Sequence, residues 1–257
     1  MERSLLELDV GRTSYVAEGQ GMALLLLHSL GVSSEAWSKV LASLAQSYAV
    51  YALDMLGHGY SDKPRSDYLI EDYAWSVVAF MDKLGLEKVV LCGNSVGALI
   101  ALEVAATYPQ RVERLILVGC PARDAWERME RLTLAALGYD AEGNPGPLSM
   151  ADLAMSYAHP TLELLEWVNQ QRVMAGIWVK KTMIAVSLYD VSPKLPLVNC
   201  PTLLLFGSQD SLREQEKVML EGIKGAEYAL VEDAGHLPQV EKPQAFLWEV
   251  NRFLGSS

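Results

Sequence analysis

The chain has 257 residues, of which 51% are hydrophobic, and a formal net charge of -11 at pH 7. This length and composition fit one domain of the larger α/β kind, with a sizeable buried core. The acidic balance, without a dense Lys/Arg run, opposes binding to phosphate backbones and to anionic lipid headgroups. We therefore expect neither a nucleic-acid partner nor a membrane partner.

The N-terminus and the cysteines both favour a soluble cytoplasmic protein. Residues 1–10 contain no long apolar segment, and no uncharged apolar run approaches the roughly 20 residues that span a bilayer. The three cysteines, Cys92, Cys120 and Cys200, lie far apart without the spacing of metal ligands. We expect buried structural thiols and no metal site.

The first half of the chain alternates between predicted strands and predicted helices. Residues 4–10 and 13–18, joined through Gly11, are predicted to form a hairpin. Short apolar runs predict further strands at residues 23–27, 48–53, 88–92 and 114–118. Helical spacing predicts helices at residues 34–44, 68–84 and 97–108. This alternation predicts a mostly parallel, doubly wound sheet covered by helices on both faces.

The alternation stops after Pro121. Residues 123–189 are helical in pattern, rich in Met and Trp, and interrupted by the loop sequence DAEGNPGP at residues 140–147. Predicted strands return at residues 202–206 and 228–232, before a last helix at residues 244–254. We predict an α/β core formed by residues 1–122 and 190–257, with residues 123–189 inserted as a helical cap.

A serine stands where a predicted strand meets a predicted helix, in the sequence VVLCGNSVGALIALEVAATYP. Ser95 is flanked by Gly93 and Gly97, which gives the Gly-x-Ser-x-Gly pattern of a nucleophile elbow in its strand-turn-helix context. The glycines let the turn close without a side-chain clash, and the helix N-terminus directs N–H groups at a developing negative charge. We therefore predict that Ser95 is a nucleophile rather than an ordinary turn serine.

Two downstream segments supply the groups that a serine nucleophile needs, a base and a carboxylate that orients it. Asp210, in FGSQD, follows one predicted strand, and His236, in EDAGHLPQVEKP, follows the next. Both therefore lie at carboxyl ends of strands, where ligand sites of open α/β sheets gather. The chain order Ser95, Asp210, His236 predicts a catalytic triad.

Other acids and histidines are alternatives to these partners. Asp124 follows the strand at residues 114–118 and could reach the histidine from the neighbouring strand end. Asp233 is too close in sequence to His236 to be a good hydrogen-bond partner for its side chain. The remaining histidines are expected to have structural roles, in loop hydrogen bonds for His28 and His58 and on the cap surface for His159.

Five segments occur in a familiar order: LLLLHSLG, DMLGHGYSDKP, GNSVGA, FGSQD and AGHLPQVEKP. Through them, nearly the whole chain resembles the α/β-hydrolase superfamily, as a serine esterase or lactonase with a helical cap. The resemblance implies that Leu30 and Val96 donate the two N–H groups of an oxyanion hole. The family usually has His-Gly where this chain has His28 and Ser29, and enol-lactonases of the β-ketoadipate type are similar in carrying Ser-Leu-Gly there.

The resemblance also implies the reaction, which is hydrolysis of carboxylic esters through an acyl-enzyme without a metal or an organic cofactor. We expect a small-molecule ester or lactone, mostly neutral, because the chain is acidic and its cap is rich in Met and Trp. Enol-lactone hydrolysis and carbon-carbon bond hydrolysis of aromatic catabolism are the alternative reactions. A hydrolase-like ligand receptor or signalling protein is the alternative outside enzymes. The sequence leaves the oligomeric state open.

The cap supplies the candidate substrate contacts. Helical spacing indicates that most of its Met and Trp side chains pack on the core, while some line the space above the nucleophile. The expected substrate-binding residues are Trp126, Met129, Trp167 and Trp178. Six basic cap residues are expected to lie mostly in solvent, with recognition of a substrate carboxylate as the alternative role: Arg123, Arg128, Arg131, Arg172, Lys180 and Lys181.

Overall fold

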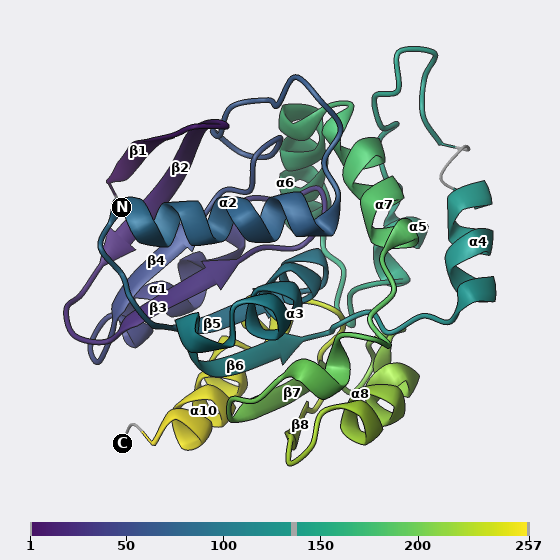
Figure 1. Cartoon of the computed structure of the whole chain (residues 1–257). Helices are drawn as coiled ribbons and strands as arrows, with labels where there is room; N and C mark the ends of the chain where they lie inside the picture. The colour runs from purple at the N-terminus through teal and green to yellow at the C-terminus, as the bar shows by residue number, and fades with distance from the viewer. Residues whose placement is uncertain (1, 135–137, 256–257) are drawn as a thin grey trace.

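A computed structural model describes residues 2–134 and 138–255 and has an eight-stranded sheet at its centre (Figure 1). The strands are β1 (Arg3–Leu8), β2 (Gly11–Glu18), β3 (Ala23–Leu27), β4 (Ala49–Leu53), β5 (Val89–Asn94), β6 (Val112–Val118), β7 (Thr202–Gly207) and β8 (Glu227–Val231). Their order across the sheet is β1-β2-β4-β3-β5-β6-β7-β8. β1 and β2 pair antiparallel with their neighbours, and the other pairs are parallel. The predicted mostly parallel α/β sheet is confirmed.

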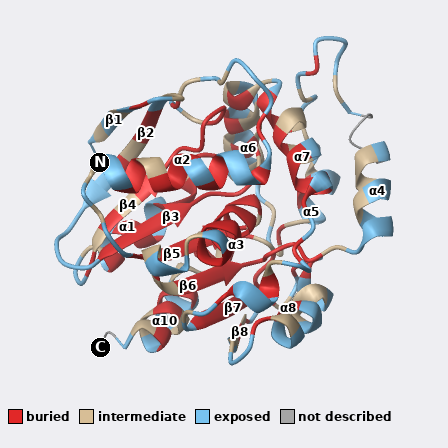
Figure 2. Ribbon diagram, viewed as in Figure 1, coloured by how far each residue is buried: buried red, intermediate tan, exposed pale blue. Residues whose placement is uncertain are grey.

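Helices cover both faces of this sheet. α2 (Ile70–Lys83), α3 (Val96–Thr107) and α8 (Glu216–Gly222) pack on one face, while α1 (Ser38–Leu44) and α10 (Pro243–Leu254) pack on the other. Every residue of β3, β5 and β7 is therefore buried, as Figure 2 shows for the middle of the sheet. This explains why these strands are continuous apolar runs rather than alternating ones.

Most expected elements form within one or two residues of their predicted ends, and the differences are local. The segment expected as one helix at residues 34–44 is a 3-10 turn, η1 (Ser34–Trp37), followed by α1. α8 was not predicted, because it has only seven residues and only Met219 among them is buried. A single buried position gives no helical period in the sequence.

Four helices occupy the segment predicted as the cap, residues 123–189, which we call the cap segment. They are α4 (Ala125–Leu134), α5 (Met150–Ala154), α6 (Leu162–Ala175) and α7 (Trp178–Leu188). Figure 1 shows them on the side toward which the arrowheads of β3 and β6 point. The DAEGNPGP loop forms no helix. An isolated β-bridge joins Pro145 of this loop to Tyr139, which directly precedes it. The division into a core domain and a cap domain stays a prediction.

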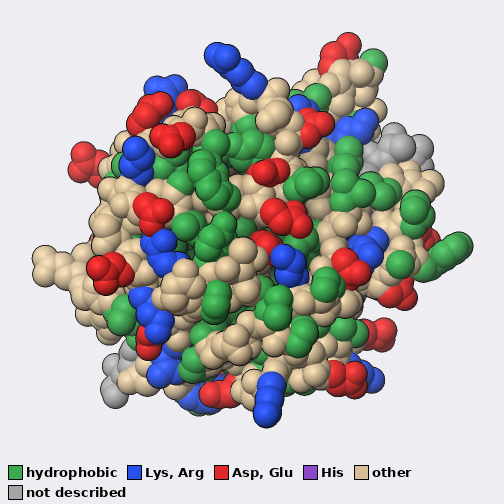
Figure 3. All heavy atoms as spheres, in the orientation of Figure 1, with side chains coloured by type: hydrophobic (Ala, Val, Ile, Leu, Met, Phe, Trp, Pro, Cys, Tyr) green, Lys and Arg blue, Asp and Glu red, His purple; other side chains and the backbone are tan. Residues whose placement is uncertain are grey.

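Charged side chains of both signs are interspersed on the face shown in Figure 3. Several form surface ion pairs, such as Lys88 with Glu113 at 2.6 Å and Arg111 with Asp82 at 2.7 Å. Exposed pairs of this kind stabilise a fold by about 0–1 kcal/mol each, so the buried core carries most of the stability. Within the described ranges, no helix is both long and apolar enough to cross a membrane.

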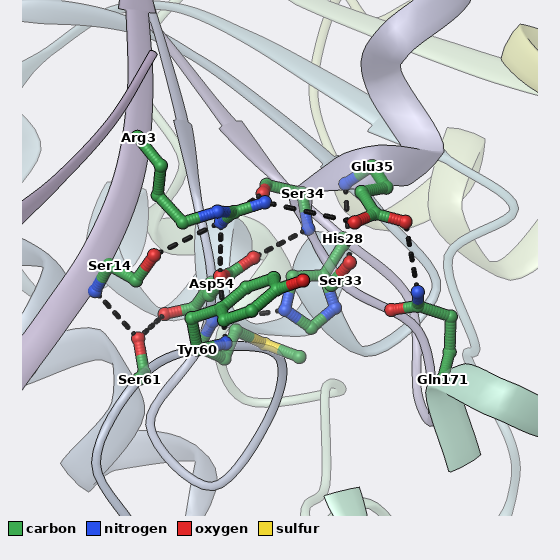
Figure 4. A network of polar contacts seen from close by, with 11 residues as sticks. Arg3, Ser14, His28, Ser33, Ser34, Glu35, Asp54, Tyr60, Ser61 and Gln171 are labelled. Atoms are coloured by element: carbon green, nitrogen blue, oxygen red, sulfur yellow. Dashed lines mark hydrogen bonds and ion pairs between the residues drawn. The ribbon is translucent and has the colours of Figure 1, made fainter. Parts of the chain in front are cut away.

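A buried carboxylate ties the N-terminal hairpin to the loops that follow β3 and β4. Asp54, which is fully buried, accepts hydrogen bonds from Arg3 Nη1 at 2.6 Å and from the amides of Ser34 at 2.8 Å and Tyr60 at 3.0 Å. Figure 4 shows these partners converging on it from separate elements. Because an unpaired buried carboxylate would be costly, the network fixes the two loops relative to each other.

The same network reaches the cap segment through Glu35. Its Oε2 accepts hydrogen bonds from Gln171 Nε2 at 2.9 Å and from Trp167 Nε1 at 3.2 Å, both on α6. Its Oε1 lies 3.9 Å from Arg3 Nη2. The position of α6 is therefore coupled to the loop that follows β3.

We predict that Asp54→Ala lowers the free energy of unfolding by about 3–5 kcal/mol, since it removes the buried ion-pair partner of Arg3 and the acceptor of the Ser34 and Tyr60 amides. Urea denaturation followed by circular dichroism measures the loss. Asp62→Ala is the matched control, because Asp62 pairs with Arg12 at 2.9 Å on the surface, where about 0–1 kcal/mol is expected. Equal losses in the two variants would contradict the role given to Asp54.

Candidate active site

Ser95 is the single residue between the end of β5 and the start of α3, and its backbone has a conformation that few residues adopt. Its φ is 58° and its ψ is -116°, and its amide donates to the Val118 carbonyl at 2.8 Å. A Cβ at Gly93 would lie 2.1 Å from the Gly97 oxygen, and one at Gly97 would lie 2.3 Å from the Leu27 oxygen. Only glycine fits at either position, so the sequence pattern reflects a tight strand-turn-helix joint that turns the serine outward.

His236 and Asp210 meet at the carboxyl ends of the last two strands. His236 Nδ1 lies 3.1 Å from Asp210 Oδ1 and 3.0 Å from Asp210 Oδ2. Burial by itself raises the pKa of Asp210. The nearby His236 and the hydrogen bond from the Leu212 amide lower it by more than burial raises it, so the pKa of Asp210 lies below its usual range. Asp210 is therefore an anion that holds the imidazole with Nδ1 toward it, which leaves Nε2 for other chemistry.

Gly119 makes room for this pair, a role that the sequence alone did not indicate. Its φ is 52°, and a Cβ there would lie 2.8 Å from Asp210 Oδ2 and 2.9 Å from His236 Nδ1. A glycine directly after an apolar strand is the sequence signal by which this role could have been found, because such a position often reflects a close approach of neighbouring groups.

The backbone of His236 forms hydrogen bonds with Asn94, which precedes Ser95, and with the cap segment. The His236 amide donates to the Ser156 carbonyl at 2.6 Å, and the His236 carbonyl accepts from Asn94 Nδ2 at 3.0 Å. Asn94 Oδ1 in turn accepts from Gln239 Nε2 at 3.2 Å. Asn94 and Gln239 are buried positioning residues that the sequence analysis missed.

The alternative acids lie elsewhere. Asp124 is exposed and caps α4, where its Oδ1 accepts from the Glu127 amide at 2.9 Å. Asp233 is also exposed and pairs with Lys242 and with His159, whose Nε2 lies 2.7 Å from Asp233 Oδ1. Neither is hydrogen-bonded to His236, and His159 has the surface position expected of it.

The other two histidines are buried beside each other near the end of β3. His28 Nδ1 donates to the Ser29 carbonyl at 2.7 Å, and His28 Nε2 accepts from the Met55 amide at 2.9 Å. This pairing makes the ring neutral, and burial lowers its pKa. The loop role expected for His28 is confirmed. His58 lies with its ring centroid 5.5 Å from that of His28, and burial lowers its pKa also.

Leu30 and Val96, the residues implied as oxyanion donors, both line the cavity into which Ser95 opens. In the described part of the chain, neither amide donates to a protein acceptor. Val96 is the first residue of α3, where helix amides have no partner within the helix. An oxyanion hole requires two amides that are free to donate, and these two lie in one cavity with Ser95 and have no acceptor among the described residues.

The cavity above Ser95 has a volume of about 370 Å³ and is lined by Ser95, His236 and Leu30 from the sheet side. The cap segment supplies the opposite wall, which includes the apolar residues Leu148, Met155, Tyr157, Val168, Met183 and Val186. A space of this size suits a small-molecule substrate.

None of the four expected substrate-binding residues lines this cavity. Trp126 and Met129 are 78% and 61% exposed on α4. Trp167 is turned toward Glu35, at the edge of a separate surface cavity. Trp178 is buried against Gly57, where a Cβ would lie 2.5 Å from the indole. The sequence could not tell which face of each helix in the cap segment the core would cover.

The cap arginines also differ from expectation. Arg123, Arg131 and Arg172 are half-buried and line the cavity. Arg128 instead pairs with Asp190 at 3.1 Å, and Lys181 pairs with Asp67 at 2.8 Å. Three guanidinium groups around the space above Ser95 do not fit the expectation of a mostly neutral substrate.

Cys92 and Cys120 are not among the described residues that line this cavity. Cys92 and Cys120 are buried and free, as expected, and burial raises the pKa of both. Among residues 2–134 and 138–255, no group of three His, Cys, Asp or Glu side chains is placed to hold a metal ion.

Comparison with known proteins agrees with this geometry. A family model described as the alpha/beta hydrolase fold matches residues 23–243. A 2-hydroxymuconate semialdehyde hydrolase of Pseudomonas sp. strain CF600 is 39% identical over 270 residues, which cover 96% of this chain and 91% of that protein. A pimeloyl-[acyl-carrier protein] methyl ester esterase of Nitrosospira multiformis is 28% identical over 279 residues, covering 95% and 99%.

A solved structure is similar over nearly the whole length. The crystal structure of the enol-lactonase from Burkholderia xenovorans LB400 superposes with a TM-score of 0.85 at 25% identity, covering 98% of this chain and 100% of that one. The sheet order, the serine elbow and these matches lead to one conclusion: the chain belongs to the α/β-hydrolase fold family.

Proposed function

We propose that the protein hydrolyses carboxylic esters or lactones of small molecules through an acyl-enzyme on Ser95. The observation that supports this most is the sharing of one cavity by Ser95 and His236, with His236 oriented by Asp210 at 3.0 Å. The free amides of Leu30 and Val96 line the same cavity.

The chemistry follows from the roles of these groups. His236 Nε2 accepts the proton of Ser95 Oγ as the oxygen attacks the ester carbonyl, and the amides of Leu30 and Val96 stabilise the oxyanion. The imidazolium then protonates the leaving alcohol, which departs and leaves Ser95 acylated. His236 next takes a proton from water, the resulting hydroxide attacks the acyl-enzyme, and Ser95 regains its proton as the acid is released. Asp210 stabilises the imidazolium in both steps.

Carbon-carbon bond hydrolysis is the second candidate. It is favoured by the 39% identity to a protein named 2-hydroxymuconate semialdehyde hydrolase. The same serine, histidine and aspartate would then act on a carbon leaving group in place of an alcohol. The two candidates share every residue named so far, so only the substrate separates them.

A substrate panel on the purified protein decides between these candidates. We expect many turnovers per protein molecule on p-nitrophenyl esters or an enol-lactone, and a lower kcat/KM on 2-hydroxymuconate semialdehyde. The reverse order would establish the second candidate. A single stoichiometric burst on every compound would instead indicate a ligand receptor that retains the triad.

Ser95→Ala is expected to lower kcat on the best ester by about a millionfold, as loss of a triad nucleophile does in serine hydrolases. Hydrolysis is followed by p-nitrophenolate release. The melting temperature should stay close to that of the parent protein, because alanine keeps the Cβ and places no larger group in the elbow. Retained turnover in a folded variant would refute the assignment of Ser95.

Asp210→Asn is expected to lower kcat by about ten-thousandfold, because an amide favours the wrong imidazole tautomer and cannot stabilise the imidazolium. Asp124→Asn is the matched control, since Asp124 only caps α4, and it should leave kcat within about twofold because surface substitutions have small effects. If Asp124→Asn gave the larger loss, the acid would lie after β6 and the assignment of Asp210 would be wrong.

A further inference from the structure

We propose that the substrate carries a carboxylate remote from its ester carbonyl, and that Arg123, Arg131 and Arg172 bind this carboxylate at the cap side of the cavity. This inference rests on the function proposed for Ser95 and names the class of substrate that the site accepts.

The three arginines reach the cavity from separate parts of the chain. Arg123 lies in the loop after β6, Arg131 lies in α4, and Arg172 lies near the end of α6. Arg172 also packs on the loop that carries Leu30, since a Cβ at Gly31 would lie 3.3 Å from its Cγ. A group bound by these side chains would therefore lie in the same cavity as the reacting serine.

Their guanidinium groups lack partners of opposite charge. Within the described ranges, no carboxylate lies at ion-pair distance from any of them, whereas Arg128, also on α4, has Asp190 at 3.1 Å. Among the described residues, Arg131 Nε donates to the Met183 sulfur at 3.1 Å and to no carboxylate. Arg172 Nε is buried without a partner, and its Nη2 reaches the Gly146 carbonyl at 3.4 Å.

One acid, Asp152, lines the cavity among the described residues, and it is already engaged. Its Oδ2 accepts from the Ser149 amide at 2.8 Å and from the Ser149 hydroxyl at 2.7 Å, which caps α5. Asp152 therefore offsets part of the field of Arg172 without forming an ion pair with it. The cavity keeps a positive excess.

Burial makes this arrangement unfavourable in the absence of an anion. Partial desolvation lowers the pKa of all three arginines, and that of Arg123 falls to about 10 because Arg131 repels its charge as well, although Glu127 and Asp210 partly offset this. All three are still charged at neutral pH. Positive charges partly removed from water around one cavity favour an anion within it.

A carboxylate is an anion that suits this wall. The planar guanidinium fork matches a carboxylate in two parallel hydrogen bonds. The apolar side chains of Val168, Met183 and Val186 line the same cavity and can contact a short hydrocarbon chain between the carboxylate and the ester carbonyl. We therefore expect a half-ester of a short dicarboxylic acid, or a lactone that bears a carboxylate, as the preferred substrate.

A matched pair of esters tests the inference. The p-nitrophenyl half-ester of glutaric acid carries a free carboxylate, and its methyl ester has the same chain with that charge removed. We expect kcat/KM to favour the half-ester by about ten- to a hundredfold, the range of one charged hydrogen-bonded contact. Raising NaCl from about 0.05 M to about 0.5 M should reduce this ratio, because salt screens the attraction. A ratio of one or less would overturn the inference.

Single variants then assign the preference to residues. Arg123→Gln, Arg131→Gln and Arg172→Gln should each lower the ratio, and the triple variant should bring it close to one. Arg128→Gln, on the same helix as Arg131 but paired with Asp190, is the matched control and should keep the ratio of the parent protein. The same fall in Arg128→Gln as in Arg131→Gln would mean that general charge, and not the cavity, sets the preference.

A binding measurement separates failure of this inference from failure of the proposed function. Glutarate is titrated into the Ser95→Ala protein by calorimetry, with inorganic phosphate as the competing anion. Glutarate binding that is weakened by Arg131→Gln and Arg172→Gln supports the carboxylate site even if no ester is turned over. Turnover of both esters at equal rates, without glutarate binding, overturns the site and leaves the hydrolase intact. Tighter binding of phosphate than of glutarate would reject a carboxylate as the ligand.

Discussion

The contact between Gly97 and the end of β3 is the constraint on which the active site depends. A Cβ at Gly97 would lie 2.3 Å from the Leu27 oxygen and 2.7 Å from the His28 oxygen. The first turn of α3 therefore rests directly on the strand end that leads to Leu30. This contact places the helix N-terminus, with its unpaired amides and positive dipole end, beside the loop that supplies the second amide.

The groups around Ser95 come from loops at several strand ends, and each loop is held by its own polar contacts. The loops after β3 and β4 meet at Asp54, and the loop that carries His236 is bonded to Asn94 and to Ser156. None of these contacts belongs to the regular hydrogen bonding of the sheet. The sheet thus sets where the strand ends lie, and buried polar side chains set the loop geometry around Ser95.

The fold could be predicted from the sequence, and so could the meeting of His236 with Asp210 beside the cavity of Ser95, because both depend on local signals. Ser95, Asp210 and His236 each follow a short apolar run, and parallel strands bring such positions to one edge of the sheet. The cavity wall could not be predicted in the same way. Whether Trp126 faces solvent and Arg131 faces the cavity depends on how α4 packs on its neighbours. The 3.6-residue period of the sequence predicts the helix but not this packing.

The bond between the His236 amide and the Ser156 carbonyl has a consequence for engineering by cap exchange. A Cβ at Gly235 would lie 2.4 Å from that same carbonyl, and Glu241 accepts hydrogen bonds from the amides of Ala158 and Gly235. Residues 156–158 are therefore part of the support of the histidine loop, although they belong to the cap segment. A chimera that takes its cap from a relative has to preserve this short stretch of backbone, or its junctions have to leave residues 156–158 with the parent chain.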